Sequence, residues 1–171
     1  MPILIDTHAH IYPCFPVERT LYFALYNLAT IRPSCTYCLC LTERESENYF
    51  EFLQKEVFQN LKVEKIDSTC LKIEFKNAEG ILLIFKGQQY VTKEKIEVLS
   101  LVSEKIEING LPLKETIQKV VENNGIPVMP WSFGKWWGKR GEKIKSFFVN
   151  NNNFNLFTGD ILLRATYDRL S

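Results

Sequence analysis

Short apolar runs of strand character alternate with segments of helical periodicity along most of this chain, and this alternation limits the folds that it can adopt. Strand character is found at 3–10, 36–42, 95–102, 125–131 and 153–160. Helical periodicity is found between these runs, at 17–30, 44–61, 112–123 and 140–150. Such alternation produces right-handed βαβ units with a parallel sheet and helices outside it. We therefore predict an α/β fold with about five parallel strands in one sheet.

The middle of the chain departs from this alternation. Residues 62–90 contain the strand-like runs KVEKI, CLKIEFK and GILLIFK, and NAEG separates the last two. Alternating side chains and a short turn are typical of antiparallel strands. We interpret 62–90 as a β meander inserted into, or capping, the main sheet of a single α/β domain over residues 1–171.

The stretch IDTHAH, residues 5–10, contains both histidines of the chain, His8 and His10. Residues two apart on a strand share a face and lie about 6 to 7 Å apart along the chain. That separation suits two imidazole ligands of one divalent ion, with metal–nitrogen bonds of about 2.0 to 2.1 Å. Asp6 falls on the same face, where it could accept a ring N–H and orient a histidine. The alternative is a pair of half-buried histidines that form ordinary hydrogen bonds.

The position of IDTHAH, at the end of the first strand of an alternating chain, resembles the start of the amidohydrolase-like TIM-barrel metal-dependent hydrolases. In that superfamily a D-x-H-x-H stretch ends strand one, and its histidines bind the catalytic ion. The resemblance therefore implies that His8 and His10 bind a divalent metal ion, most often zinc. The segments PWSFGKWWGKRG and FTGD also look like later strand-end loops of TIM-barrel hydrolases.

The chain departs from the family pattern in its length and in its ligands. It has 171 residues and no third histidine, whereas a complete (β/α)₈ barrel needs about 250 residues. We therefore expect a partial or truncated TIM-type barrel. Asp160 is the candidate for a further ligand or for the catalytic general base, and its alternative role is that of a helix N-cap or turn residue. Glu43 is a weaker candidate, which we expect to be a solvated surface residue.

The segment WSFGKWWGKRGEKIK, residues 131–145, contains all three tryptophans of the chain and several basic residues. Lys135 or Arg140 could bind a carboxylate or phosphate, and Trp131 or Trp136 could supply a flat apolar surface. These four residues are our candidates for substrate binding. The alternative is that the tryptophans are buried against helices and the basic side chains are solvated.

The overall charge and hydropathy bear on the partners and the location of the chain. Lys and Arg number 21 and Asp and Glu 20, which argues against nucleic acid as a partner. The start of the chain lacks a signal-peptide pattern and no apolar stretch approaches about 18 residues, so we expect a cytoplasmic protein without a membrane partner. Cys35, Cys38 and Cys40 cannot converge on one ion from a single strand, and we expect buried, reduced thiols.

The leading functional hypothesis is a metal-dependent hydrolase in which metal-activated water attacks a carbonyl or ester of a small-molecule substrate. The basic loop favours an anionic substrate. The alternative is a catalytically inactive barrel remnant that acts by binding. Missing strands would leave a sheet edge and an apolar interior exposed, so a second copy of the chain would be expected to cover them.

Overall fold

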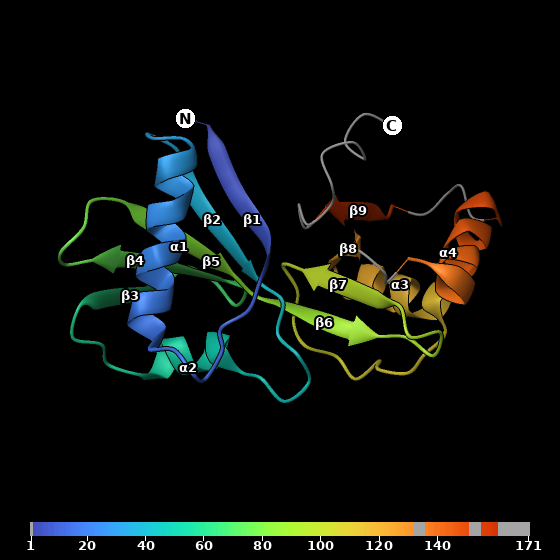
Figure 1. Cartoon of the computed structure of the whole chain (residues 1–171). Coiled ribbons are helices and arrows are strands. Elements are labelled where there is room, and N and C mark those ends of the chain that lie inside the picture. Colours follow the sequence, from blue (N-terminus) through green and yellow to red (C-terminus); the bar gives the residue numbers. More distant parts are fainter. Residues whose placement is uncertain (1, 132–135, 151–154, 161–171) are drawn as a thin grey trace.

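The structure is a computed structural model, and it describes residues 2–131, 136–150 and 155–160. Two β-sheets lie next to each other within these ranges, and helices pack against them (Figure 1). Helix α1 runs along one face of the first sheet, and α3 and α4 accompany the second (Figure 1).

The first sheet has the strand order β1-β2-β5-β4-β3. Its strands are β1 (Ile3–Ala9), β2 (Thr36–Leu41), β3 (Leu61–Lys65), β4 (Cys70–Phe75) and β5 (Ile81–Phe85). Helices α1 (Val17–Ile31) and α2 (Tyr49–Lys55) follow its first two strands. Strand β2 pairs in parallel with β1 and with β5, whereas β4 pairs antiparallel with β5 and with β3.

The second sheet has the strand order β6-β7-β8-β9. Its strands are β6 (Gly87–Val91), β7 (Glu97–Leu101), β8 (Ile126–Trp131) and β9 (Phe157–Asp160). Helix α3 (Leu113–Glu122) precedes β8, and α4 (Gly138–Asn150) follows it. Strand β7 is antiparallel to β6 and to β8, and only the pair β8 and β9 is parallel among the described strands of this sheet.

The predicted partial TIM-type barrel is therefore wrong. Both sheets mix parallel and antiparallel pairs, and neither sheet closes on itself within the described residues. The runs in 62–90 form the strands β3, β4 and β5, which pair antiparallel in chain order. Because β5 also pairs in parallel with β2, these strands are part of the first sheet and are not an insertion. The continuous apolar run of β5 (ILLIF) is typical of a buried central strand. Without a barrel, the expectation that a second copy covers an open barrel loses its basis.

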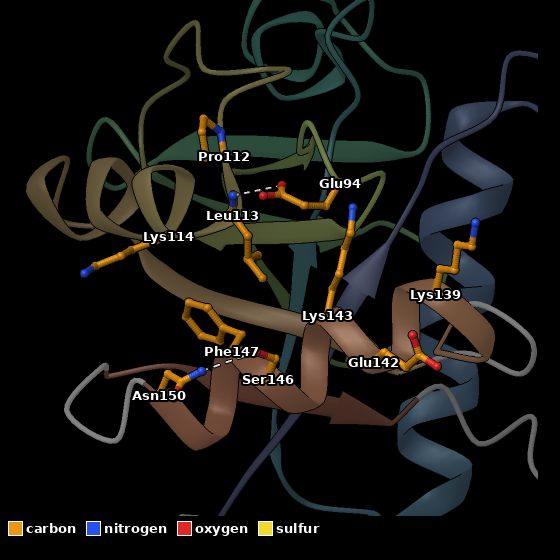
Figure 2. Close-up of a pocket in the computed structure, with 10 residues that line it drawn as sticks. All are labelled: Glu94, Pro112, Leu113, Lys114, Lys139, Glu142, Lys143, Ser146, Phe147 and Asn150. Atoms are coloured by element: carbon orange, nitrogen blue, oxygen red, sulfur yellow. Dashed lines mark hydrogen bonds between the residues drawn. The ribbon is translucent and has the colours of Figure 1, made fainter.

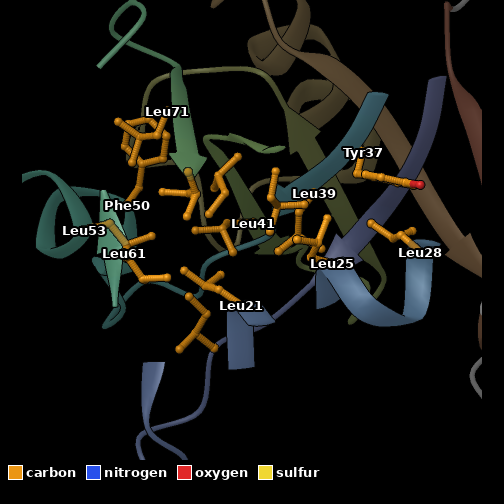
Figure 3. Close-up of a cluster of buried hydrophobic side chains, with 14 of the residues drawn as sticks. Leu21, Leu25, Leu28, Tyr37, Leu39, Leu41, Phe50, Leu53, Leu61 and Leu71 are labelled. Atoms are coloured by element: carbon orange, nitrogen blue, oxygen red, sulfur yellow. The ribbon is translucent and has the colours of Figure 1, made fainter. Parts of the chain in front are cut away.

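The core of the first sheet lies between the sheet and its two helices (Figure 3). Leu21, Leu25 and Leu28 form one stripe of α1 and are buried against the leucines of β2, Leu39 and Leu41. Burial of each such side chain contributes about 1.5 to 3 kcal/mol to folding. This packing fixes α1 against β1 and β2, where the candidate site lies.

The backbone just after β2 joins the two sheets. The Glu43 N–H donates to the carbonyl of Gly87 at 3.2 Å, and the Gln89 N–H donates to the carbonyl of Glu43 at 2.8 Å. A Cβ at Gly87 would lie 2.6 Å from the carbonyl oxygen of Leu41 and 2.7 Å from that of Ser100. Glycine is therefore required where the strands approach each other most closely.

The cysteines of β2 and of the loop before it are buried free thiols, as predicted. Cys40 packs with Leu99, Leu101 and Val128 of the second sheet, and burial raises its pKa to about 12. Burial also raises the pKa of the Cys38 thiol, so Cys38 and Cys40 remain protonated and act as small apolar side chains.

Candidate functional site

The two histidines have their rings in contact at the carboxyl end of β1. The Nε2 atoms of His8 and His10 lie 3.2 Å apart, and the ring centroids are 5.1 Å apart at an interplanar angle of 65°. Two nitrogens bound to one tetrahedral ion at about 2.05 Å would lie about 3.3 Å apart. The separation of the two Nε2 atoms therefore matches that of two ligands on one ion.

Strand β1 does not alternate regularly up to these rings. Asp6 lies opposite Leu39 and Ala9 lies opposite Leu41, so three steps along β1 match two along β2. Such a bulge interrupts the regular alternation of side chains along the strand. His10 follows the end of the strand, and it still contacts His8 and lines one pocket with Asp6.

Asp6 accepts a hydrogen bond, but from a backbone group. Its Oδ1 accepts the backbone N–H of His8 at 3.0 Å, which holds the chain at the bulge. The structure thus gives Asp6 a different contact from the ring N–H bond that the sequence suggested.

Glu47 is the carboxylate that faces the imidazole of His10, and sequence analysis missed it. Its Oε2 lies 4.0 Å from Nδ1 of His10, and the same oxygen accepts the backbone N–H of Arg44 at 2.8 Å. The side chains of His10 and Glu47 are 12% and 16% exposed. Because β1 and β2 are parallel neighbours, the loops that follow them lie at the same edge of the sheet. This rule was the available signal that a residue of the loop after Leu41 would lie beside His10.

The Nδ1 atom of His10 is buried and makes no hydrogen bond to any residue in the described ranges. Burial lowers the pKa of His10 below 6.5, and the neighbouring His8 lowers it further, while Glu47 opposes this shift. A neutral imidazole has one nitrogen that can donate a lone pair to a metal ion.

A pocket of about 570 Å³ lies between β1 and α1 beside the histidines. Asp6 and His10 line it from the side of β1, and Arg19, Phe23 and Asn27 line it from α1. Its volume falls in the range of small-molecule sites, about 300 to 1,000 Å³. The pocket therefore connects one imidazole of the pair with a cation and an aromatic ring.

Among the described residues, no group of three or more His, Cys, Asp or Glu side chains is arranged to hold a metal ion. Two histidines are fewer protein ligands than the three of a usual catalytic zinc site. An ion held by this pair would take its remaining ligands from water or from a bound molecule.

Asp160, the predicted catalytic carboxylate, is the last residue of β9. Its backbone lies opposite Trp131 of β8, in the second sheet, whereas the histidines follow β1 in the first. The side chain of Asp160 and the whole of Lys135 lie outside the described residues. Their predicted roles remain predictions.

The candidate residues of the tryptophan loop have structural contacts. The indole Nε1 of Trp136 donates to the carbonyl of Pro130 at 3.1 Å, and the Trp136 ring lies 6.4 Å from that of Phe148. Trp131 and Arg140 are half-buried. Trp136 packs against the core of the second sheet, which agrees with the alternative of burial against helices.

A pocket near this loop is formed by other residues (Figure 2). It lies between α3 and α4, and both lysines and glutamates line it: Glu94, Lys114, Lys139, Glu142 and Lys143. Glu94 accepts the backbone N–H of Leu113 at 3.0 Å, at the start of α3. The structure does not bring Trp131, Trp136 and Arg140 together in this pocket.

Glu43 is a buried residue, so the expectation of a solvated side chain is wrong. It is 3% exposed, and its Oε1 accepts the backbone N–H of Phe50 at 2.7 Å. Burial raises the pKa of this carboxyl above 4.5. The side chain of Glu43 connects the end of β2 to α2 and is part of the core.

Comparison of the chain with protein-family models, with curated proteins and with solved structures finds no match. None of the helices in the described ranges combines the length and the apolar character needed to cross a bilayer.

Proposed function

We propose that this chain binds one divalent metal ion, zinc above all, through the Nε2 atoms of His8 and His10, and uses it to hydrolyse a small molecule. The observation that supports this proposal is the 3.2 Å separation of the two Nε2 atoms. Zinc binds imidazole nitrogen readily and accepts tetrahedral geometry, in which such a separation is expected.

The surroundings of His10 also fit a metal ligand. A histidine that binds metal through Nε2 carries its proton on Nδ1, and this N–H usually donates to a carboxylate or carbonyl. The buried Nδ1 of His10 has Glu47 as its nearest carboxylate, at 4.0 Å. A small rotation of either side chain would bring these atoms into hydrogen-bond distance.

When bound, the ion would supply a water of lowered pKa and would polarise the bond to be cleaved. His8 and His10 would fix its position, and Glu47 would orient the ring of His10. Asp6, the one carboxylate among the described residues that line the pocket with His10, would accept a proton from the bound water. The pocket between β1 and α1 would hold the substrate.

A zinc titration tests the metal site. Chelator-treated protein is titrated with zinc in competition with a chromophoric chelator, and the wild-type chain is compared with His8→Gln and His10→Gln. We expect one zinc ion per chain, and we expect each variant to lose about a hundredfold in affinity, at least as much as the loss of an outer partner costs. Circular dichroism checks that both variants fold.

Cys14 provides the matched control, because it is an exposed thiol that could bind zinc without specificity. Cys14→Ser should bind zinc as the wild type does. Unchanged zinc affinity in both histidine variants would contradict the proposal, and the 3.2 Å contact would then be a hydrogen bond between neutral rings. Hydrolysis is tested separately with p-nitrophenyl acetate and p-nitrophenyl phosphate, where zinc-dependent turnover should be lost in His10→Gln.

A further inference from the structure

We infer that the pocket between β1 and α1 binds a small molecule that joins an anionic group, carboxylate or phosphate, to an apolar group. Arg19 would contact the anionic group, and Phe15 and Phe23 would contact the apolar part. That such a molecule is the substrate rests on the proposed function, whereas binding in the pocket does not.

One face of α1 provides a row of side chains to this pocket. Arg19, Phe23 and Asn27 are spaced four residues apart, so they lie above one another on the helix, and all three line the pocket. The buried leucines of α1 lie on a different stripe and hold the helix against the sheet. The two stripes separate the binding face from the packing face of α1.

Arg19 is a cation available to a ligand. Its guanidinium carbon lies 5.5 Å from the ring centroid of Phe23, and its side chain forms no ion pair or hydrogen bond with a described residue. This cation–π contact restrains the guanidinium over the ring of Phe23 and leaves its N–H groups available to a ligand. A planar set of donors of this kind suits a carboxylate or phosphate.

Two phenylalanines give the pocket its apolar part. Phe15 is 60% exposed and Phe23 is 44% exposed, although both are large apolar side chains. Both line the pocket together with Ala9, Ile11 and Ala24, which surround it with carbon atoms. Exposed aromatic rings around a hollow are typical of small-molecule sites.

The charges around the pocket favour an anion when the metal ion is present. Asp6 and Arg19 carry opposite charges in the lining, and His10 belongs both to this lining and to the imidazole pair. A divalent ion at His10 would therefore leave an excess of positive charge beside Arg19. Zinc should strengthen the binding of an anion in this pocket.

Calorimetric titration with phenylphosphonate tests the inference on zinc-loaded and on chelator-treated protein. Benzyl alcohol and inorganic phosphate serve as probes for the apolar part and for the anion alone. We expect phenylphosphonate to bind more tightly than either, and more tightly with zinc than without. Arg19→Gln should weaken phenylphosphonate about tenfold, the effect of one charge-assisted hydrogen bond at an exposed site.

Matched controls come from α1 and from the residue that follows it. Arg32→Gln changes an arginine just beyond the end of α1, and Tyr26→Ala removes an aromatic ring that is 57% exposed; neither residue lines the pocket. Both controls should bind phenylphosphonate as the wild type does, whereas Phe23→Ala should weaken it severalfold. Arg32→Gln, Tyr26→Ala and Phe23→Ala should bind zinc with unchanged affinity, and Arg19→Gln should bind it no more weakly than the wild type, since none of these residues contacts the imidazole pair.

The two proposals fail in different ways. Zinc-loaded protein that does not bind phenylphosphonate, or an Arg19→Gln variant that binds it like the wild type, overturns the pocket and leaves the metal site standing. Equal affinity for benzyl alcohol and phenylphosphonate overturns the requirement for an anion. Protein that binds no zinc but binds phenylphosphonate through Arg19 overturns the metal site and supports the pocket.

Discussion

Replacement of Glu47 by Gln should weaken zinc binding although Glu47 is not a ligand. The carboxylate lies 4.0 Å from Nδ1 of His10, and the backbone N–H of Arg44 holds its Oε2 in place at 2.8 Å. An N–H on Nδ1 would donate to this oxygen once Nε2 binds the ion. A neutral amide in place of the carboxylate accepts that hydrogen bond less strongly. It also does not stabilise the positive charge that the ring acquires when Nε2 binds the ion.

The size of the effect follows from the geometry. Loss of an outer-shell partner usually lowers metal affinity about ten- to a hundredfold. The 4.0 Å separation is longer than a hydrogen bond, which places Glu47 at the weaker end of this range. Both side chains are largely buried, so solvent screens the interaction only in part. We expect a loss of about tenfold, or about 1.4 kcal/mol.

The assay is the chelator competition at pH 7.5, with Glu45→Gln as the matched control. Glu45 lies in the same loop, and its carboxylate accepts a hydrogen bond from the side chain of Asn109 at 3.2 Å. We expect zinc affinity to be unchanged in Glu45→Gln and about tenfold lower in Glu47→Gln. Equal affinities in the two variants would refute the assigned role of Glu47, because a general effect of loop charge would then be the better explanation.

Three stability predictions test the fold, each by urea unfolding. Leu21→Ala should cost about 3 kcal/mol, because Leu21 is fully buried, whereas Ile31→Ala on the same helix, where Ile31 is 72% exposed, should change the free energy of unfolding by less than about 0.5 kcal/mol. Gly87→Ala should cost about 2 kcal/mol, since the new Cβ would lie 2.6 Å from the carbonyl oxygen of Leu41; an unchanged midpoint would show that the sheets do not meet there. Burial raises the pKa of Glu43 above 4.5, so the unfolded state loses this proton first and stability falls as pH rises from 4.5 through the folded-state pKa. Glu43→Gln should remove this loss and raise the urea midpoint at pH 7, and a lower midpoint at both pH 4 and pH 7 would contradict it.

Local sequence patterns predicted much of the secondary structure. The leucine spacing of 17–30 predicted α1, and the apolar runs predicted the positions of β1, β2 and β8. The helix expected over 44–61 is shorter, because α2 covers only Tyr49–Lys55. Val57 falls within the predicted helix but follows the end of α2, and it is 97% exposed. Residues 56–60 connect α2 to β3, and only Leu61 of the predicted helix belongs to that strand.

Strand pairing was beyond the reach of these patterns. Alternation of strands and helices indicates parallel pairing only when each strand joins the next through a helix. Strand β5 takes part in both arrangements, since it pairs antiparallel with β4 in a meander and in parallel with β2. The pairing with β2 depends on contacts distant in sequence, which local patterns do not show. The barrel prediction failed for this reason.

The candidate site was predictable in part. Spacing alone predicted that His8 and His10 would lie close to each other, but the bulge between Asp6 and Ala9 and the approach of Glu47 depend on the pairing of β1 with β2. The spacing of Arg19 and Phe23 on α1 was visible in the sequence, but nothing marked that face as the wall of a pocket. Trp136 carries an aromatic ring suited to binding, yet its indole is held by Pro130.

X-ray absorption at the zinc edge counts the imidazole ligands around the bound ion, and so it tests whether His8 and His10 bind zinc together. We expect two imidazoles per zinc, with metal–nitrogen distances of about 2.0 to 2.1 Å and light-atom ligands for the remainder. In His8→Gln and in His10→Gln we expect one imidazole per zinc. A wild-type spectrum with sulfur ligands, or with no imidazole scattering, would contradict a metal site built from the two Nε2 atoms that lie 3.2 Å apart.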